Sequence, residues 1–350
     1  MTHLTYLEAA VVGLVQGVSE MFPVSSLGHN VLIPALVGGS WARDLNVAAP
    51  ESPYLAFIVG LHVATAIALL VYFRWDWARI IGGLFSSIRD RRVESGDQKL
   101  AWMIILATIP VGIAGLVFEH AFRVIFGKPV IAGIFLAVNG IILIAGERYR
   151  TRASLAADSA VAAARESAEL VAAKRHPATD HPAGDHSPGR PSAGDHALRQ
   201  QEQAAMVQAA MAQAAMAQAD QRLASMSYLR AVTIGAAQIL ALLAGISRDG
   251  VTMVAGLARG LSREDAARFA FLLATPVILA AGALKIPDLL GPLGAGIRGQ
   301  ILLGSAASGI GGYLSVRFLL RYLRTRTLTP FGVYCLVAGL ASVTYLGLVK

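Results

Sequence analysis

Two short stretches of this chain carry side chains that could perform acid–base and phosphate chemistry. In the first stretch Gln16 and Glu20 are four residues apart, so a helix would place both on one face. Pro23 would end that helix, and a tight turn with two hydroxyls and an imidazole follows it. A carboxylate or imidazole beside a serine is typical of general-base and nucleophilic catalysis. The candidate residues are Gln16, Glu20, Ser25, Ser26, Gly28 and His29.

The second stretch, Gly245 to Thr252, has the composition of an anion-binding turn. Its glycines let backbone N–H groups approach a ligand, and a helix starting after Gly250 would point its N-terminal dipole at an anion. The guanidinium of Arg248 can bind phosphate oxygens in a forked geometry. We expect Arg248 to act with a substrate-binding set from both stretches: Gln16, Ser25, Ser247, Gly250 and Thr252.

Several of these residues allow more than one interpretation. Asp249 either neutralises Arg248 or, together with Glu20, holds a divalent cation. The structural alternatives are a hydrogen-bonded kink that satisfies His29, and an ion pair of Arg248 with Asp249 or Glu20. Two mechanisms fit: Ser26 attacks phosphorus while His29 or Glu20 takes its proton, or one of these bases activates a water. The spacing of Ser26 and His29 slightly favours the first.

The two stretches share a skeleton, which indicates a duplicated unit. Four positions of the first stretch recur in the second about 222 residues later. The pairs are Gly13 and Gly235, Gln16 and Gln238, Ser25 and Ser247, and Gly28 and Gly250. The residues that differ are complementary, since one copy contributes an acid and a base and the other a cation.

The composition of the chain is that of a polytopic membrane protein. Of its 350 residues 55% are apolar and 15% charged, and its mean hydropathy is +0.57. Polar residues interrupt the first apolar segment, so no cleaved signal peptide is expected. Apolar runs close to the ~20 residues that cross a bilayer predict six spans, at about 55–73, 101–119, 130–146, 266–284, 300–320 and 331–349.

Lysine and arginine predict the orientation of these spans, because basic loops are retained in the cytoplasm. The basic loops follow the first, third and fifth spans, from Arg74 to Lys99, from Arg148 to Arg152 and from Arg321 to Arg326. They alternate with less basic loops, which we expect on the outer side together with the C-terminus. This bias accounts for the net charge of +8, so no nucleic-acid partner is expected.

The two halves of the chain are predicted to be inverted copies. Each half has one polar-interrupted segment, 4–36 or 229–261, followed by three spans, and an odd number of spans inverts the second half. Such a segment predicts a helical hairpin that enters the membrane and turns back. The expected fold class is an all-α polytopic membrane protein: an inverted-topology repeat with six transmembrane helices and two re-entrant helical hairpins, whose tips meet near the midplane. The first membrane repeat is predicted over 1–150 and the second over 227–350.

Residues 151–226 form an insert between the halves. They are rich in Ala, Gln, His and Pro, which predicts a disordered cytoplasmic segment. Cys335 stands alone in an apolar span and excludes a disulfide framework. The repetitive spacing of the histidines in the insert is not that of a metal site; they are His176, His181, His186 and His196.

Both motifs resemble those of the undecaprenyl-diphosphatase family, the bacitracin-resistance type of integral membrane phosphatase. Gln16-x-x-x-Glu20 matches the family's Glu/Gln-x-x-x-Glu element, and the segment from Pro23 to His29 matches its Pro-x-Ser-Ser-x-Gly-His. The second stretch matches Pro-Gly-x-Ser-Arg-Ser-Gly-x-Thr, except that Ala244 replaces the proline and Asp249 the second serine. Softer matches lie at Leu61 to Thr65, Thr108 to Pro110 and Phe269 to Pro276.

The resemblance implies dephosphorylation of undecaprenyl diphosphate to the monophosphate on the outer side of the bacterial cytoplasmic membrane. This recycles the lipid carrier for peptidoglycan and other envelope polymers, and bacitracin resistance follows from faster recycling. The resemblance also implies magnesium or calcium as cofactor and a polyprenyl diphosphate and membrane lipids as partners, and it leaves a homodimer open. By position, the family's functional residues fall on Glu20, Ser26, His29, Ser247, Arg248 and Thr252, with Gln16 at a variable acidic position.

Two other classes of membrane protein fit part of the pattern. The lipid phosphatase type shares fragments, but no Lys-x6-Arg-Pro element precedes the first motif, and Val254 stands where that type needs a histidine. An inverted-repeat transporter or lipid flippase for a phosphate-bearing substrate would also use re-entrant hairpins. The adjacent serines Ser25 and Ser26 and the resemblance favour the enzyme.

Overall fold

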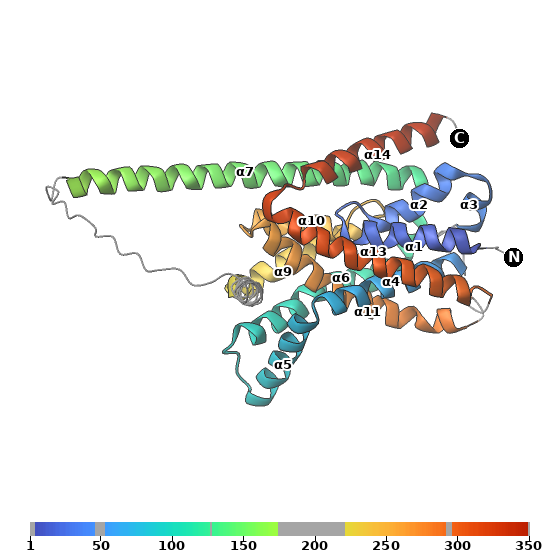
Figure 1. Cartoon of the computed structure of the whole chain (residues 1–350), viewed down its shortest axis with the longest axis horizontal. Coiled ribbons are helices and arrows are strands. Elements are labelled where there is room, and N and C mark those ends of the chain that lie inside the picture. The colour runs from blue at the N-terminus through green and yellow to red at the C-terminus, as the bar shows by residue number, and fades with distance from the viewer. Residues whose placement is uncertain (1–3, 46–52, 127, 174–220, 292–295, 349–350) are drawn as a thin grey trace, which may run out of the picture. The chain divides into compact units, whose positions relative to one another are not determined.

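The computed structural model describes the backbone of residues 4–45, 53–126, 128–173, 221–291 and 296–348. Within these ranges the chain is all helix and connecting turn (Figure 1). It forms two compact units, one of Met1–Arg150 with Leu223–Lys350 and one of Thr151–Arg222. Both motif stretches belong to the first unit.

The first motif folds as a helical hairpin. α1 (Tyr6–Met21) ends before Pro23, as the sequence predicts, and α2 (Ser26–Val37) begins directly after the N-cap Ser25. Ser25 adopts a φ of 67°, in the left-handed region, and this reverses the chain between the two helices. The short α3 (Gly39–Asp44) follows.

The second motif folds as a second hairpin. Its first leg is α9 (Tyr228–Ala236), continued by a 3₁₀ helix, η1 (Ala237–Leu242), and its second leg is α10 (Arg248–Ala258). α10 begins before Gly250 and not after it, because Ser247 caps the helix. The Ser247 Oγ accepts the backbone N–H of Gly250 at 3.1 Å.

The remaining helices are longer, and several could cross a membrane. In the described ranges, four segments are long and apolar enough, and α4 with α5 would add a fifth if their 85° bend lies within one span. The prediction of an all-helical polytopic membrane protein is therefore confirmed. The long helices are α4 (Pro53–Tyr72), α5 (Arg74–Asp90), α6 (Gly96–Phe126), α7 (Pro129–Ala173), α11 (Arg263–Leu290), α13 (Arg298–Thr325) and α14 (Thr329–Leu348).

α13 covers the predicted span 300–320 but is not among the four apolar segments. Its buried residues include glycines and serines, which lie against α1 and α4. A Cβ on Gly13 of α1 would collide with the carbonyl of Gly304, so the two backbones touch where these helices cross. Small residues replace large apolar ones on this face of α13 because α1 and α4 cover it. The six-span layout stays a prediction.

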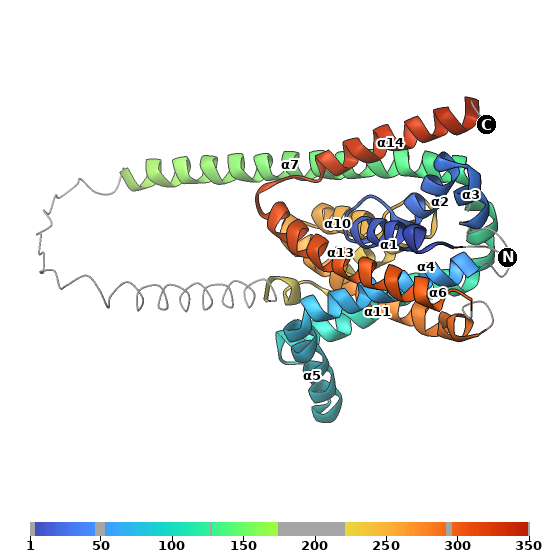
Figure 2. The same cartoon turned by 45° about the vertical axis from the view of Figure 1, so that its right-hand side comes forward.

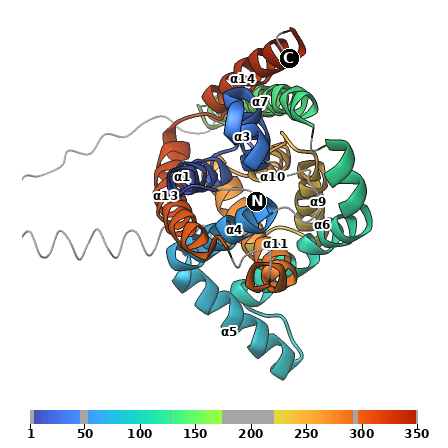
Figure 3. The ribbon, with the colours of Figure 1, turned by 90° about the vertical axis from the view of Figure 1, so that its right-hand side faces the viewer.

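The second half of the chain makes the corresponding helix crossing. A Cβ on Gly235 of α9, the repeat equivalent of Gly13, would collide with the carbonyl of Ala107 on α6. Figure 3 shows α1 beside α13 on one side of the first unit and α9 beside α6 on the other. The first leg of each hairpin therefore packs against a long helix of the other half.

α7 continues to Ala173, whereas the composition predicts disorder from residue 151. Alanine is frequent between residues 153 and 173, and its high helix propensity accounts for the extension. Residues 174–220, with the histidines of the insert, lie outside the described residues. Before residue 150, α7 runs beside α14 (Figure 2), and the two helices approach through Gly133, Gly140, Gly332 and Gly339.

Candidate functional site

The tips of the two hairpins contact each other, and the contacts are reciprocal. A Cβ on Gly28 would lie 2.9 Å from the Cα of Gly245, and a Cβ on Gly250 would lie 3.2 Å from the Cβ of Pro23. Gly28 is equivalent to Gly250 in the repeat, and Pro23 is equivalent to Gly245. The same pair of equivalent positions therefore makes contact twice, once with each copy contributing the glycine of the helix start, as at an interface between like units.

Asn139 of α7 joins the two tips through its side-chain amide. Its Nδ2 donates to the Pro23 carbonyl at 2.9 Å, and its Oδ1 accepts the backbone N–H of Ser247 at 3.0 Å. The Asn139 side chain is fully buried. The sequence interpretation did not single it out, although a polar residue in an apolar span is a signal of this kind.

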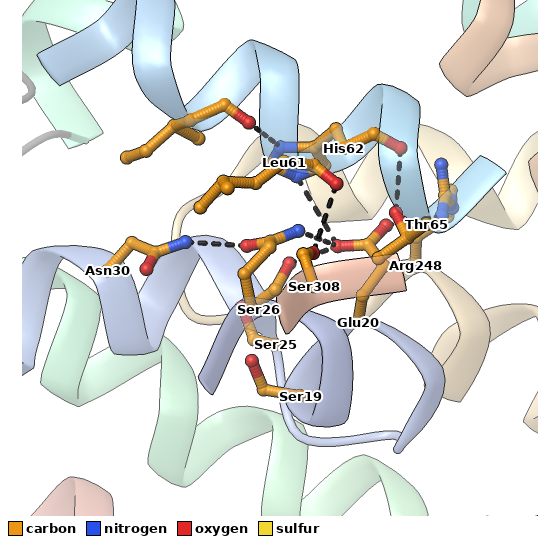
Figure 4. Close-up of polar contacts among 12 residues, drawn as sticks. Ser19, Glu20, Ser25, Ser26, Asn30, Leu61, His62, Thr65, Arg248 and Ser308 are labelled. Atoms are coloured by element: carbon orange, nitrogen blue, oxygen red, sulfur yellow. Dashed lines mark hydrogen bonds and ion pairs between the residues drawn. The ribbon is translucent and has the colours of Figure 1, made fainter. Parts of the chain in front are cut away.

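Glu20 lies at the centre of the site (Figure 4). Its Oε2 accepts the amide proton of Gln16 Nε2 at 2.9 Å and the hydroxyl proton of Ser26. Its Oε1 accepts from Arg248 Nη2 at 2.6 Å. Groups from α1, α2 and α10 therefore converge on one buried carboxylate. The structure brings together the acid, the hydroxyl and the cation that the two motifs supply separately.

Two residues that the sequence interpretation did not assign to the site complete its surroundings. His62 of α4 places Nε2 3.3 Å from Glu20 Oε2, and Asn30 donates its Nδ2 proton to Gln16 Oε1 at 2.6 Å. His62 lies in one of the softer matching segments, but it is on a separate helix and no spacing rule links it to Glu20. Asn30 follows His29 directly in the sequence. Its side chain points to Gln16, whereas that of His29 points to Tyr334.

The Ser26 hydroxyl is held by Glu20 and not by His29. The His29 Nδ1 lies 2.7 Å from the Ser25 carbonyl oxygen, and its Nε2 lies 2.7 Å from Tyr334 Oη. Both ring nitrogens are thus occupied, and the ring stacks on Tyr334 with centroids 5.8 Å apart. His29 lines an apolar groove of about 470 Å³ between α1, α2 and α14. The pair of His29 with Ser26 suggested by their spacing is not formed in the described structure, because the bond to Ser25 turns the ring away.

The hydroxyls expected to bind phosphate lie at the starts of α2 and α10. Ser25 Oγ accepts the Gly28 N–H at 3.2 Å, the same capping bond that Ser247 makes in the other copy. Thr252 donates its hydroxyl to the Arg248 carbonyl at 2.7 Å. These bonds order the two helix starts, whose positive dipole ends both lie at the contact between the tips.

Asp249 is buried, and neither of its carboxylate oxygens has a hydrogen-bond partner in the described structure. Its Oδ1 lies 3.5 Å from Arg248 Nε. The ion-pair alternative for Arg248 is therefore present, with Glu20 as the closer partner and Asp249 as the second.

A cation held jointly by Glu20 and Asp249 does not fit these contacts. Both oxygens of Glu20 already accept hydrogen bonds, whereas Mg²⁺ and Ca²⁺ bind through several oxygen ligands with available lone pairs. Across the described ranges, no group of three or more His, Cys, Asp or Glu residues could hold a metal ion. The described side chains thus do not form a site for the expected cofactor.

These observations define a class: an all-helical membrane protein in which a serine hydroxyl, a carboxylate and a guanidinium meet where two repeated hairpins touch. The chain matches the family described as Bacitracin resistance protein BacA over residues 9–170 and 200–341. It belongs to this family, and the resemblance drawn from the two motifs is confirmed.

Relatives of known name match almost the whole chain. The undecaprenyl-diphosphatase of Mycolicibacterium paratuberculosis is 56% identical over 346 residues, which cover 99% of each chain. The undecaprenyl-diphosphatase 1 of Frankia casuarinae is 52% identical over 370 residues, covering 99% of this chain and all of the relative. The undecaprenyl-diphosphatase 2 of Chromobacterium violaceum is 35% identical over 97% of this chain and 98% of its own.

Proposed function

We propose that this protein hydrolyses undecaprenyl diphosphate to undecaprenyl phosphate and inorganic phosphate, and so recycles the lipid carrier of cell-envelope synthesis. The observation that carries the proposal is the convergence of Ser26, Glu20 and Arg248, which supply a nucleophile, a base and an anion-binding group. Membership of the family and the names of the relatives support the substrate. Faster recycling accounts for the bacitracin resistance in the family's description.

In the proposed mechanism the Ser26 Oγ attacks the terminal phosphorus, and its proton passes to Glu20 along the existing hydrogen bond. The bond from phosphorus to the bridging oxygen breaks, and undecaprenyl phosphate leaves with the electron pair and takes the proton from Glu20. Water then attacks the phosphoserine while Glu20 accepts a water proton and returns it to the departing Ser26 oxygen. The hydrogen bond from Ser26 to Glu20 supports this route over direct attack by water, because it places the hydroxyl beside a base.

Arg248 is proposed to bind the phosphate oxygens. Its Nη2 bonds Glu20, whereas its buried Nε has no hydrogen-bond partner in the described structure. The planar guanidinium has five N–H donors, so one bond to a carboxylate leaves donors for an anion. The starts of α2 and α10 add positive dipole ends beside it.

We further propose six transmembrane spans (α4, α6, α7, α11, α13 and α14) and two re-entrant hairpins (α1 with α2, and α9 with α10), related as an inverted repeat. The reciprocal contacts of the tips and the equivalent helix crossings support this arrangement. The alternation of basic loops supports insertion in the bacterial cytoplasmic membrane with the site open to the outer side. The division into 1–150, 151–226 and 227–350 belongs to the same proposal.

We propose the divalent cation as a companion of the substrate and not as an ion held by the protein alone. Because the described side chains form no site for it, magnesium or calcium would arrive bound to the phosphate oxygens of the substrate. No step of the mechanism above depends on the ion.

The test is release of inorganic phosphate from a polyprenyl diphosphate by the purified protein in detergent. We expect Glu20→Gln and Arg248→Ala to lose activity by about 10²-fold or more. Ser26→Ala should lose activity too, and it should no longer retain radiolabelled terminal phosphate on the chain after an acid quench. Ser19→Ala is the matched control, because the Ser19 hydroxyl bonds its own helix at Val15. An active Ser26→Ala variant would exclude the serine nucleophile, and full turnover by Arg248→Ala would refute the site.

A further inference from the structure

The contacts of His62 determine where its protons lie. Its Nδ1 is 2.9 Å from the carbonyl oxygen of Ile58, one turn earlier in α4. A carbonyl oxygen can only accept, so Nδ1 carries a hydrogen. The other ring nitrogen, Nε2, lies 3.3 Å from Glu20 Oε2.

Glu20 behaves as an ionised acceptor. It accepts hydrogen bonds from the amide of Gln16, the hydroxyl of Ser26 and the guanidinium of Arg248. A lone pair on His62 Nε2 would face this carboxylate unfavourably, whereas an N–H there would be attracted to it. With hydrogens on both ring nitrogens, His62 is an imidazolium.

The second positive charge matters when the substrate arrives. In the described structure Arg248 is bonded to Glu20 at 2.6 Å, and the proposed reaction needs the same guanidinium to bind phosphate. An Arg248 that also binds phosphate shares its charge between two anions, and a buried carboxylate that loses its compensating cation is strongly unfavourable. His62 lies on the other oxygen of the carboxylate and can keep Glu20 compensated while Arg248 shares its donors with the anion.

We infer that His62 is the second cation of this site, a positioning residue that holds the Glu20 carboxylate so that Arg248 is available to the diphosphate. This inference rests on the proposed function. The charged groups facing His62 are Glu20 from α1 and Arg248 from α10, next to which lies Asp249. From α13, Ser308 donates its hydroxyl to the Leu61 carbonyl at 3.1 Å, and this group does not titrate. From α11, Arg268 is held by Asp76 beyond the end of α4.

The experiment compares wild type with His62→Gln, which keeps a hydrogen-bond donor without charge, and with His62→Lys, which restores a charge. Each purified protein is first checked for monodisperse elution and thermal unfolding in detergent. Phosphate release from a polyprenyl diphosphate is then measured across pH, and inorganic pyrophosphate is used as a competitive inhibitor. Tyr54→Phe is the matched control, because Tyr54 is a titratable residue of the same helix α4 whose hydroxyl bonds the Asn30 carbonyl at 3.4 Å.

For His62→Gln we expect the inhibition constant of pyrophosphate to rise about tenfold, the difference between a charged and a neutral partner. Wild type should lose kcat/KM as rising pH removes the proton from His62. His62→Gln should lack this alkaline fall, and Tyr54→Phe should keep it. In His62→Lys the fall should move to higher pH, because an ammonium holds its proton longer than an imidazolium. If His62→Gln does not fold, the position of the alkaline fall in His62→Lys tests the charge on His62 instead.

An unchanged inhibition constant and an unchanged alkaline fall in His62→Gln, or an unmoved fall in His62→Lys, would overturn the inference while the proposed function stands. If wild type releases no phosphate, the proposed function fails instead. In that case the thermal shift caused by pyrophosphate still tests His62, since the shift should shrink in His62→Gln.

Discussion

Replacing Asn139 by alanine tests whether a single buried amide holds the two hairpin tips together. The substitution removes the partner of the Ser247 N–H and leaves the Pro23 carbonyl with only the Cys335 thiol at 3.8 Å. A buried polar group without a partner costs about 1–3 kcal/mol. Because one group loses its partner fully and the other in part, we expect Asn139→Ala to lower the free energy of unfolding by about 2–4 kcal/mol.

The same substitution should also reduce turnover, because Ser247 immediately precedes the phosphate-binding Arg248. Unfolding in detergent and phosphate release are measured on the same preparations. Val138→Ala is the matched control: Val138 is the adjacent residue on α7 and is 36% exposed, so its loss should change stability by no more than about 0.5 kcal/mol. Wild-type stability and turnover in Asn139→Ala would refute the idea that this amide aligns the tips.

Three further predictions follow from the contacts. Gly13→Ala should destabilise the fold by about 1–3 kcal/mol, because the new Cβ meets the Gly304 carbonyl. Gly112→Ala on α6 is the control; its Cβ would lie in open space, so it should be neutral or slightly stabilising. Equal unfolding temperatures of the two variants would contradict this prediction. Asp249→Ser should raise the unfolding temperature and keep turnover, because it removes two buried carboxylate oxygens without hydrogen-bond partners; lost turnover would show that Asp249 takes part in the reaction. Incubation with a chelator should leave the unfolding temperature unchanged, since the described side chains form no metal site, and a fall would reveal one.

Much of the architecture follows from local properties of the sequence. Apolar runs and helix-ending signals such as Pro23 predict helices and their approximate limits, because hydropathy and backbone restriction act over a few residues. The helix starts are less predictable: Ser247 begins α10 before Gly250 through a side-chain cap. α13 has a low hydropathy because small residues form the face that packs on α1 and α4. Its hydropathy therefore does not show whether it crosses the membrane.

The site was predictable as a set of residues but not as a set of partners. Glu20, Ser26 and Arg248 are predictable from their types and from their positions next to the repeated residues, and they do converge. The spacing of Ser26 and His29 suggested a different pair, because spacing along a helix gives the shared face but not the rotamer. The bond of His29 to Tyr334 depends on α14, which lies far away in the chain.

The sequence by itself determined that this is a helical membrane protein with a duplicated motif, and which acid, hydroxyl and guanidinium belong to it, because residue type, period and repetition are properties of the chain. Only the tertiary structure decided which groups meet. The reciprocal contact of Gly28 with Gly245 and of Gly250 with Pro23, the amide of Asn139 across both tips, and the approach of His62 to Glu20 all depend on how separate helices pack. Those contacts join residues too distant in sequence for any local rule to relate.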